Sequence, residues 1–73
     1  MSKVYEVRSM IYGKYDSEAD LAKELGWPRQ KLNKITNGTK EPDIYEVKAL
    51  AEKLDRSASD MIDIFLSNKS PND

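Results

Sequence analysis

The stretch LAKELGWPRQKLNKITNG, residues 21–38, constrains the fold of this chain more than any other. Gly26 interrupts it between two short apolar patterns, which consist of Leu21, Ala22 and Leu25 before the glycine and Leu32 and Ile35 after it. Apolar residues three and four positions apart form one face of a helix, and glycine adopts at little cost the left-handed backbone that ends a helix. The stretch therefore predicts two short helices joined by a sharp turn.

The same spacing and the capping residues predict five helices along the chain. We expect them over residues 3–14, from Ser17 to Gly26, over 28–36, from Asp43 onward and from Ser57 onward. The apolar stripes are Val4, Val7 and Ile11 in the first, Ile44, Val47, Leu50, Ala51 and Leu54 in the fourth, and Ala58, Met61, Ile62 and Phe65 in the fifth. Pro28 suits the first turn of the third helix. The chain is therefore predicted to be one all-α domain over residues 1–66 with a polar, flexible tail at 67–73.

The residue types that the chain lacks exclude several kinds of site. It has 73 residues with no cysteine and no histidine, which removes disulfides, thiolate or imidazole metal ligands, and Cys or His catalysis. Asp60 and Asp63 suit capping and solvation, so we expect no enzyme, no metal and no cofactor. No apolar stretch reaches the roughly 18 residues of a membrane span, and the start MSKVYEVRSM lacks a signal-peptide core. We expect a cytoplasmic protein without a membrane partner.

Charge is distributed unevenly along the chain. The net charge is −1, yet residues 29–40 contain four basic residues and no acid. Residues 41–66 contain seven acids and three bases. A local basic patch attracts a polyanion even when the whole chain is acidic, and it is also a common kind of solvated surface. Charge alone leaves both interpretations open.

Two short helices joined by a three- or four-residue turn with a glycine are typical of a helix-turn-helix, which here covers about residues 18–37. If Leu32 and Ile35 face the core, the outward side chains of the helix over 28–36 are Arg29, Gln30, Asn33 and Lys34. Arginine pairs with the acceptors of guanine, and glutamine or asparagine with adenine. These four residues are therefore predicted to read base edges in the DNA major groove.

A second set of residues is predicted to contact DNA phosphates. Lysine ammonium groups neutralise phosphates, and the free N–H groups at the start of a helix bind anions. The set comprises Ser17, Glu18, Lys31, Asn37 and Lys40. A carboxylate that faces phosphates repels them, so Glu18→Gln is expected to tighten DNA binding, unless Glu18 folds back to the helix start or accepts from a cytosine amino group. Replacing Lys40 is expected to reduce the slope of log affinity against log salt concentration by about 1.

Residues 17 to about 66 resemble the phage repressor and Cro-type helix-turn-helix domain, also called the XRE family. The resemblance rests on SEADLAKELGWPRQKLNKITNGTKEPDIYEVKALAEKLDRSASDMI, with the loop of Asn37, Gly38 and Pro42 and the ALAEKL helix. It implies a five-helix lambda-repressor-like fold and, in most members, a dimer on a palindromic operator. It also implies a transcriptional regulator of the repressor kind, of phage or mobile-element origin. Glu18 stands where many members have glutamine, and Asp55 where glycine is usual.

The fifth helix offers a surface for a homodimer. Ile64 and Leu66 widen its apolar arc beyond what a core-facing helix needs, so they are predicted to form the dimer interface. A second function stays open: a protein-interaction module of the same fold, such as a toxin-neutralising antitoxin or an anti-repressor. The acidic second half of the chain and Glu18 favour it. A steep salt dependence of DNA retention is expected only for a DNA-binding protein.

Overall fold

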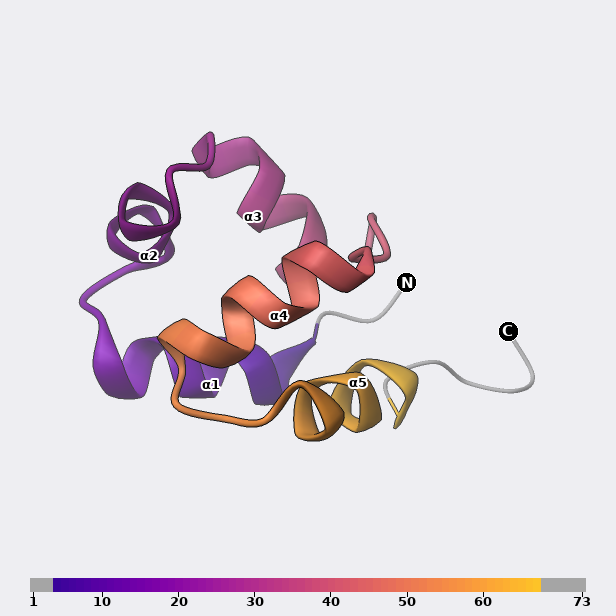
Figure 1. Ribbon diagram of the computed structural model, residues 1–73. Helices are drawn as coiled ribbons and strands as arrows, with labels where there is room; N and C mark the ends of the chain where they lie inside the picture. Colours follow the sequence, from indigo (N-terminus) through magenta and orange to yellow (C-terminus); the bar gives the residue numbers. More distant parts are fainter. Residues whose placement is uncertain (1–3, 68–73) are drawn as a thin grey trace.

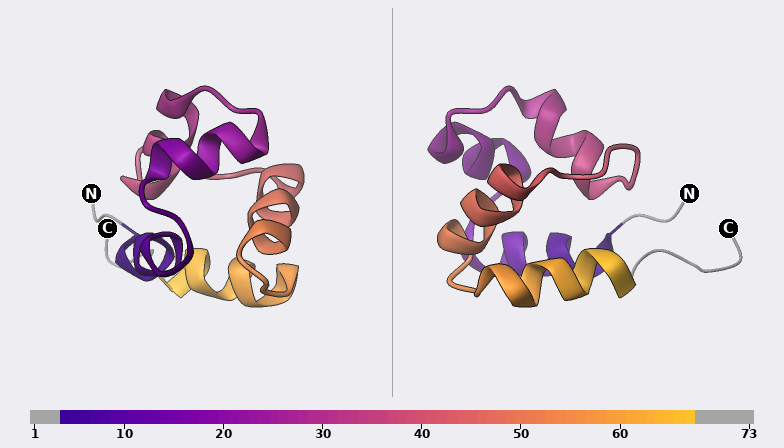
Figure 2. Two further views of the ribbon diagram at one scale, coloured as in Figure 1. Left: turned by 90° about the vertical axis from the view of Figure 1, so that its left-hand side faces the viewer. Right: turned by 45° about the vertical axis from the view of Figure 1, so that its right-hand side comes forward.

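The computed structural model describes residues 4–67, which form five helices and no strand. They are α1 (Tyr5–Lys14), α2 (Glu18–Leu25), α3 (Arg29–Thr36), α4 (Ile44–Lys53) and α5 (Ala58–Ser67). Figure 1 shows α2 and α3 at one end of the molecule, α1 and α5 at the other, and α4 between them. The two views in Figure 2 agree with this arrangement. The prediction of an all-α domain of five helices is confirmed for the described residues.

Most predicted boundaries agree with the structure, and three differ. Val4 precedes α1 instead of lying inside it, and its N–H donates to the Thr36 carbonyl at 2.8 Å, which ties the chain start to the end of α3. Pro28 is the N-cap of α3 and lies just before the first turn, in extended conformation. Helix α5 continues through Ser67, where the polar tail was predicted to begin. Residues 68–73 of that tail lie outside the described residues.

Polar side chains begin three of the helices, as their spacing predicted. The Ser17 hydroxyl accepts from the Asp20 N–H at 3.2 Å, and the Ser57 hydroxyl accepts from the Asp60 N–H at 3.0 Å. At the start of α4, Asp43 accepts from the Glu46 N–H at 2.8 Å, and Glu46 accepts from the Asp43 N–H at 2.9 Å. Each bond satisfies a backbone donor that has no partner inside its helix.

Helices α2, α3 and α4 end in the same way, with a residue in the left-handed backbone conformation. These residues are Gly26 (φ 73°), Gly38 (φ 80°) and Asp55 (φ 58°). In each case the next N–H donates across the turn to a carbonyl five residues back: Trp27 to Ala22, Thr39 to Lys34 and Arg56 to Ala51, all at 2.9 Å. This is the Schellman arrangement. Asp55 adopts it without being glycine, and its carboxylate lies 2.6 Å from Lys14 Nζ at the end of α1.

The core contains side chains from all five helices. Those with no exposed surface are Val7, Ile11, Leu21, Leu32, Ile35, Leu50 and Met61. Burying each of the larger ones stabilises the fold by about 1.5–3 kcal/mol. The prediction that Ile44 belongs to the apolar stripe of its helix is wrong, because the side chain is 57% exposed. Ile44 is the first residue of α4, and the buried stripe begins one turn later at Val47.

Candidate nucleic-acid interface

The turn after α2 places α3 at the edge of the molecule. Gly26 reverses the chain, and the Trp27 N–H bonds to the Ala22 carbonyl, so α3 leaves the turn in a fixed direction. Leu32 and Ile35 are fully buried and anchor α3 on the core. Figures 1 and 2 show α3 beside α2, with no other helix over its outer side. The opposite face of α3 is therefore available to a partner.

That outer face carries the side chains that were predicted to read bases. Arg29, Gln30 and Lys34 are exposed, and Asn33 is half-buried. Positions 29, 30, 33 and 34 share one side of a helix, so the structure brings the four together. The face contains two cations, two amides and no acid. This combination of donors and acceptors matches the edges of guanine and adenine in the major groove.

Lys31, one of the predicted phosphate contacts, already has partners within the chain. Its Nζ lies 3.2 Å from Glu46 Oε2 and 4.6 Å from the centroid of the Trp27 ring. The ammonium group is therefore held between a carboxylate of α4 and an aromatic ring in the turn. Lys31 is therefore engaged inside the domain before any phosphate arrives.

Lys40 is held by the same carboxylate. Its Nζ lies 2.6 Å from Glu46 Oε1, and the Glu46 side chain is only 7% exposed. Burial alone would raise the pKa of Glu46, but hydrogen bonds from Lys40, from the Asp43 backbone and from Lys31 outweigh it, so the pKa lies below its ordinary value. Glu46 is thus ionised at neutral pH and shared by two lysines.

The structure places Glu18 differently from the expectation that its carboxylate faces a phosphate. The residue is buried, Thr36 Oγ1 donates to its Oε1 at 2.9 Å, and Arg8 Nε lies 3.3 Å from its Oε2. The reason is that α1 and the end of α3 pack around the start of α2 and supply both partners. A carboxylate engaged in this way joins three helices. Only the backbone N–H of Glu18, at the first position of α2, remains suited to a phosphate.

The other two predicted phosphate residues lie at helix ends. The Ser17 hydroxyl caps α2, so its contact with an anion would use the backbone at the positive end of that helix. Asn37 is exposed at the C-cap of α3, beside the outer face. The Asn37 N–H donates to the carbonyl of Asn33, one of the four predicted base-reading residues, at 2.9 Å.

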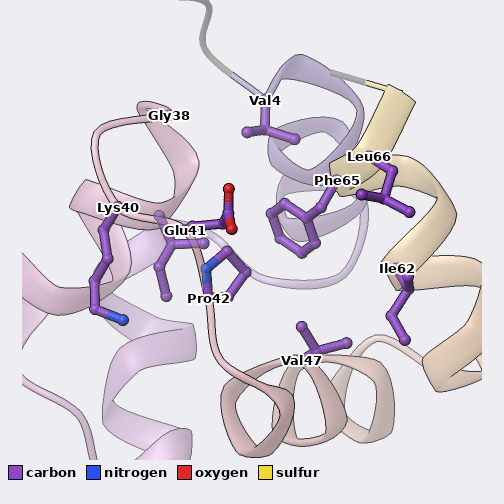
Figure 3. Close-up of a pocket in the computed structure, with 10 residues that line it drawn as sticks. Val4, Gly38, Lys40, Glu41, Pro42, Val47, Ile62, Phe65 and Leu66 are labelled. Atoms are coloured by element: carbon purple, nitrogen blue, oxygen red, sulfur yellow. The ribbon is translucent and has the colours of Figure 1, made fainter. Parts of the chain in front are cut away.

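A hollow of about 190 Å³ lies between the loop after α3, helix α4 and helix α5. Figure 3 shows Phe65 between Pro42 and Leu66, while Lys40 extends away from Phe65. Leu66 on its rim is 60% exposed, whereas Ile64 is half-buried and packs against the core. Of the two predicted interface residues, Leu66 is therefore the more accessible.

Within residues 4–67 there is no group of three or more acidic side chains close enough to hold a metal ion. No helix in this range is long and apolar enough to cross a membrane.

A family model described as helix-turn-helix matches residues 16–61, which is more than half of the chain. The chain belongs to this family of Cro- and repressor-like (XRE) helix-turn-helix domains. The match begins just before the cap of α2 and ends within α5, so it contains the whole α2–turn–α3 unit. Neither a curated protein nor a solved structure matches the chain significantly. The family is one of DNA-binding domains, and the domain is accordingly a DNA-binding regulator of the helix-turn-helix type.

Two functional residues were missed at the level of sequence. Glu46 stands three positions after the cap Asp43, and this spacing is a signal for a capping box, but nothing local indicates its two lysine partners. Arg8 lies on α1, outside the matched range, and pairs with Glu18 ten positions away. Both contacts depend on how the helices pack.

Proposed function

We propose that the domain is a sequence-specific transcriptional regulator of the repressor kind, which inserts α3 into the DNA major groove. The observation that carries this proposal is the outer face of α3, where Arg29, Gln30 and Lys34 are exposed without an acid among them. Arg29 and Gln30 stand at the amino-terminal end of α3, which enters the groove first in helix-turn-helix domains. Arg29 would pair with guanine and Gln30 with adenine.

The remaining contacts divide between bases and backbone. Asn33 and Lys34, one turn further along α3, would reach the next base pairs and the adjoining phosphates. The backbone at Ser17 and Glu18 would bind a phosphate at the start of α2, and Asn37 would bind another beside the end of α3. Backbone contacts of this kind fix the register of a domain on DNA without reading sequence.

A single module of this size buries only about 600–1,000 Å² on DNA, so we propose that two copies bind a palindromic operator. The exposed Leu66 beside the apolar hollow supports α5 as the interface, with Ile64 contributing its accessible edge. A two-fold dimer would then present two α3 helices to half-sites about one helical turn apart.

The proposal is tested by alanine substitutions of Arg29 and Gln30, measured on the sequence that the protein selects and on random duplex. Each is expected to cost about 1–3 kcal/mol on the selected sequence and to relax preference at one position of each half-site. Arg56→Ala is the matched control, because Arg56 is exposed and belongs to the loop between α4 and α5, outside the helix-turn-helix. Equal losses on selected and random DNA would overturn the base-reading role.

A second candidate is a protein-interaction module, such as an antitoxin or an anti-repressor. The observation in its favour is that Glu46 already forms ion pairs with Lys31 and Lys40. Fewer basic side chains are then free to bind DNA phosphates. Retention on immobilised duplex DNA during a salt gradient separates the two functions. A DNA-binding regulator is retained at low salt and elutes as the salt concentration rises, because its affinity falls steeply with salt. A module that binds only protein is not retained even at low salt.

A further inference from the structure

We propose that Glu46 limits how much of the DNA affinity comes from phosphate contacts, because it holds the ammonium groups of Lys31 and Lys40 in internal ion pairs. This inference rests on the proposed DNA-binding function and adds to it a residue that determines specificity without contacting DNA. Glu46 acts through the two lysines and is therefore a positioning residue.

The geometry of the cluster joins three parts of the chain. Lys31 comes from α3, Lys40 from the loop after it and Glu46 from the first turn of α4. The two ammonium groups bind different oxygens of one carboxylate, Lys40 at Oε1 (2.6 Å) and Lys31 at Oε2 (3.2 Å). Each oxygen of the Glu46 carboxylate is thus paired with one ammonium group.

Glu46 is fixed in this position by its second role. The Asp43 N–H donates to Oε1 at 2.9 Å, which is the oxygen that also binds Lys40. Turning the carboxylate outward would break the capping box of α4 as well as both ion pairs. The Glu46 side chain is 7% exposed, whereas the Lys31 and Lys40 side chains are 36% and 38% exposed, so water reaches the ion pairs mainly from the side of the lysines. A phosphate must therefore compete with a preorganised carboxylate for each lysine.

The consequence is a shift from non-specific toward specific binding. Each phosphate that a protein neutralises adds about 0.9 to the slope of log affinity against log salt, whatever the sequence. Lysines that stay paired with Glu46 contribute little to this slope. Binding then depends more on Arg29 and Gln30, which read bases, and the ratio of specific to random affinity rises.

The test is Glu46→Gln, measured on selected and random duplexes between 50 and 200 mM salt, a range over which counterion release changes affinity strongly. The amide oxygen still accepts from the Asp43 N–H, so α4 keeps its cap while the lysines lose their anion. We expect the salt slope on random DNA to steepen by about 1–2 units, at about 0.9 per lysine released, and the ratio of specific to random affinity to fall. Glu52→Gln is the matched control, because it removes the same charge from an exposed position on α4.

A second set of variants keeps the inference testable if Glu46→Gln fails to fold. In the wild type, Lys40→Met is expected to reduce the salt slope by less than half of what Lys34→Met does, because Lys34 is exposed on α3. If Glu46→Gln does fold, adding Lys40→Met to it is expected to remove about one unit of the added slope.

Three results would overturn the inference. The first is that the wild-type protein binds DNA but Glu46→Gln and Glu52→Gln have the same salt slope on random DNA. This result would overturn the inference and leave the proposed function intact. The second is that Lys40→Met lowers the wild-type salt slope as much as Lys34→Met does. This result would also overturn only the inference, because Lys40 would then contact phosphate despite Glu46. Wild-type protein that binds no duplex at low salt would overturn the proposed function, and this inference with it.

Discussion

Glu18 connects α1, α2 and α3 through one buried carboxylate. Its Oε1 accepts from the Thr36 hydroxyl at the end of α3, and its Oε2 lies beside Arg8 of α1. A buried carboxylate without partners destabilises a fold, so these two contacts are what make its burial favourable. The residue therefore contributes to the placement of α3 through its contacts with Thr36 and Arg8.

At this scale we predict that Glu18→Gln lowers the free energy of unfolding by about 1–3 kcal/mol and leaves DNA affinity no tighter. The amide oxygen can keep the Thr36 bond, but the amide nitrogen then faces Arg8, and two donors cannot satisfy each other. Urea unfolding measures the first effect and low-salt DNA binding the second. Glu24→Gln is the control, because Glu24 on the same helix forms only an exposed pair with Lys53 at 3.7 Å. Tighter DNA binding with unchanged stability would show that the carboxylate faces phosphate after all.

At the scale of the elements, the ion pairs that join α4 to Lys31 and Lys40 depend on the ionisation of Glu46. Its pKa is lower in the folded protein than its ordinary value of 4.5, because hydrogen bonds from Lys40, the Asp43 backbone and Lys31 outweigh the opposing effect of burial. A lowered folded pKa means that the ionised group stabilises the fold above pH 4.5. This contribution is lost as the pH falls through the folded pKa.

We therefore predict that the difference in thermal stability between wild type and Glu46→Gln is constant at neutral pH and narrows below about pH 4.5. Melting curves from pH 7 to pH 3 measure it, with Glu52→Gln as the reference for removing a charge. A difference that stays constant down to pH 3 would contradict the ion pairs of Glu46.

The elements also separate what sequence predicts from what it does not. Gly26 and the apolar spacing on either side of it predict α2 and α3, because both signals are local. The left-handed Asp55 has no such signal, since its carboxylate is paired with Lys14, which is 41 positions away. Glu46 likewise meets Lys31 from a different helix. Helical periodicity alone predicts which side chains of α3 face outward. The partners of the charged residues inside the domain depend on how the helices pack, and the sequence pattern does not predict them.

At the scale of the whole molecule, the basic stretch 29–40 and the acidic stretch 41–66 are joined by ion pairs. Lys31 and Lys40 belong to the acid-free stretch, yet both pair with Glu46 from the acidic half. The basic surface around α3 is therefore narrower than four cations suggest and centres on Arg29 and Lys34. This narrowing is compatible with a net charge of −1.

Assembly is also a property of the whole molecule, and we predict that Leu66→Asp shifts the protein toward monomer. Leu66 is exposed, so a charge there leaves the core intact while opposing an apolar contact between two copies. Operator affinity should fall with it, because each half-site must then bind alone. Sedimentation velocity with and without operator-length DNA measures both effects. Tyr12→Asp is the comparison, since Tyr12 is similarly exposed on α1. Dissociation by Tyr12→Asp instead of Leu66→Asp would place the interface on α1.

The most direct test of the central claim, that α3 reads DNA sequence, is selection of bound duplexes from a random pool with the wild-type protein, followed by sequencing. We predict a two-fold symmetric consensus whose half-sites are about 10 base pairs apart, centre to centre. We further predict that Arg29→Ala loses one preferred position from each half-site. Recovery of duplexes with no enriched sequence, at a salt concentration where the protein is retained on DNA, would contradict this claim.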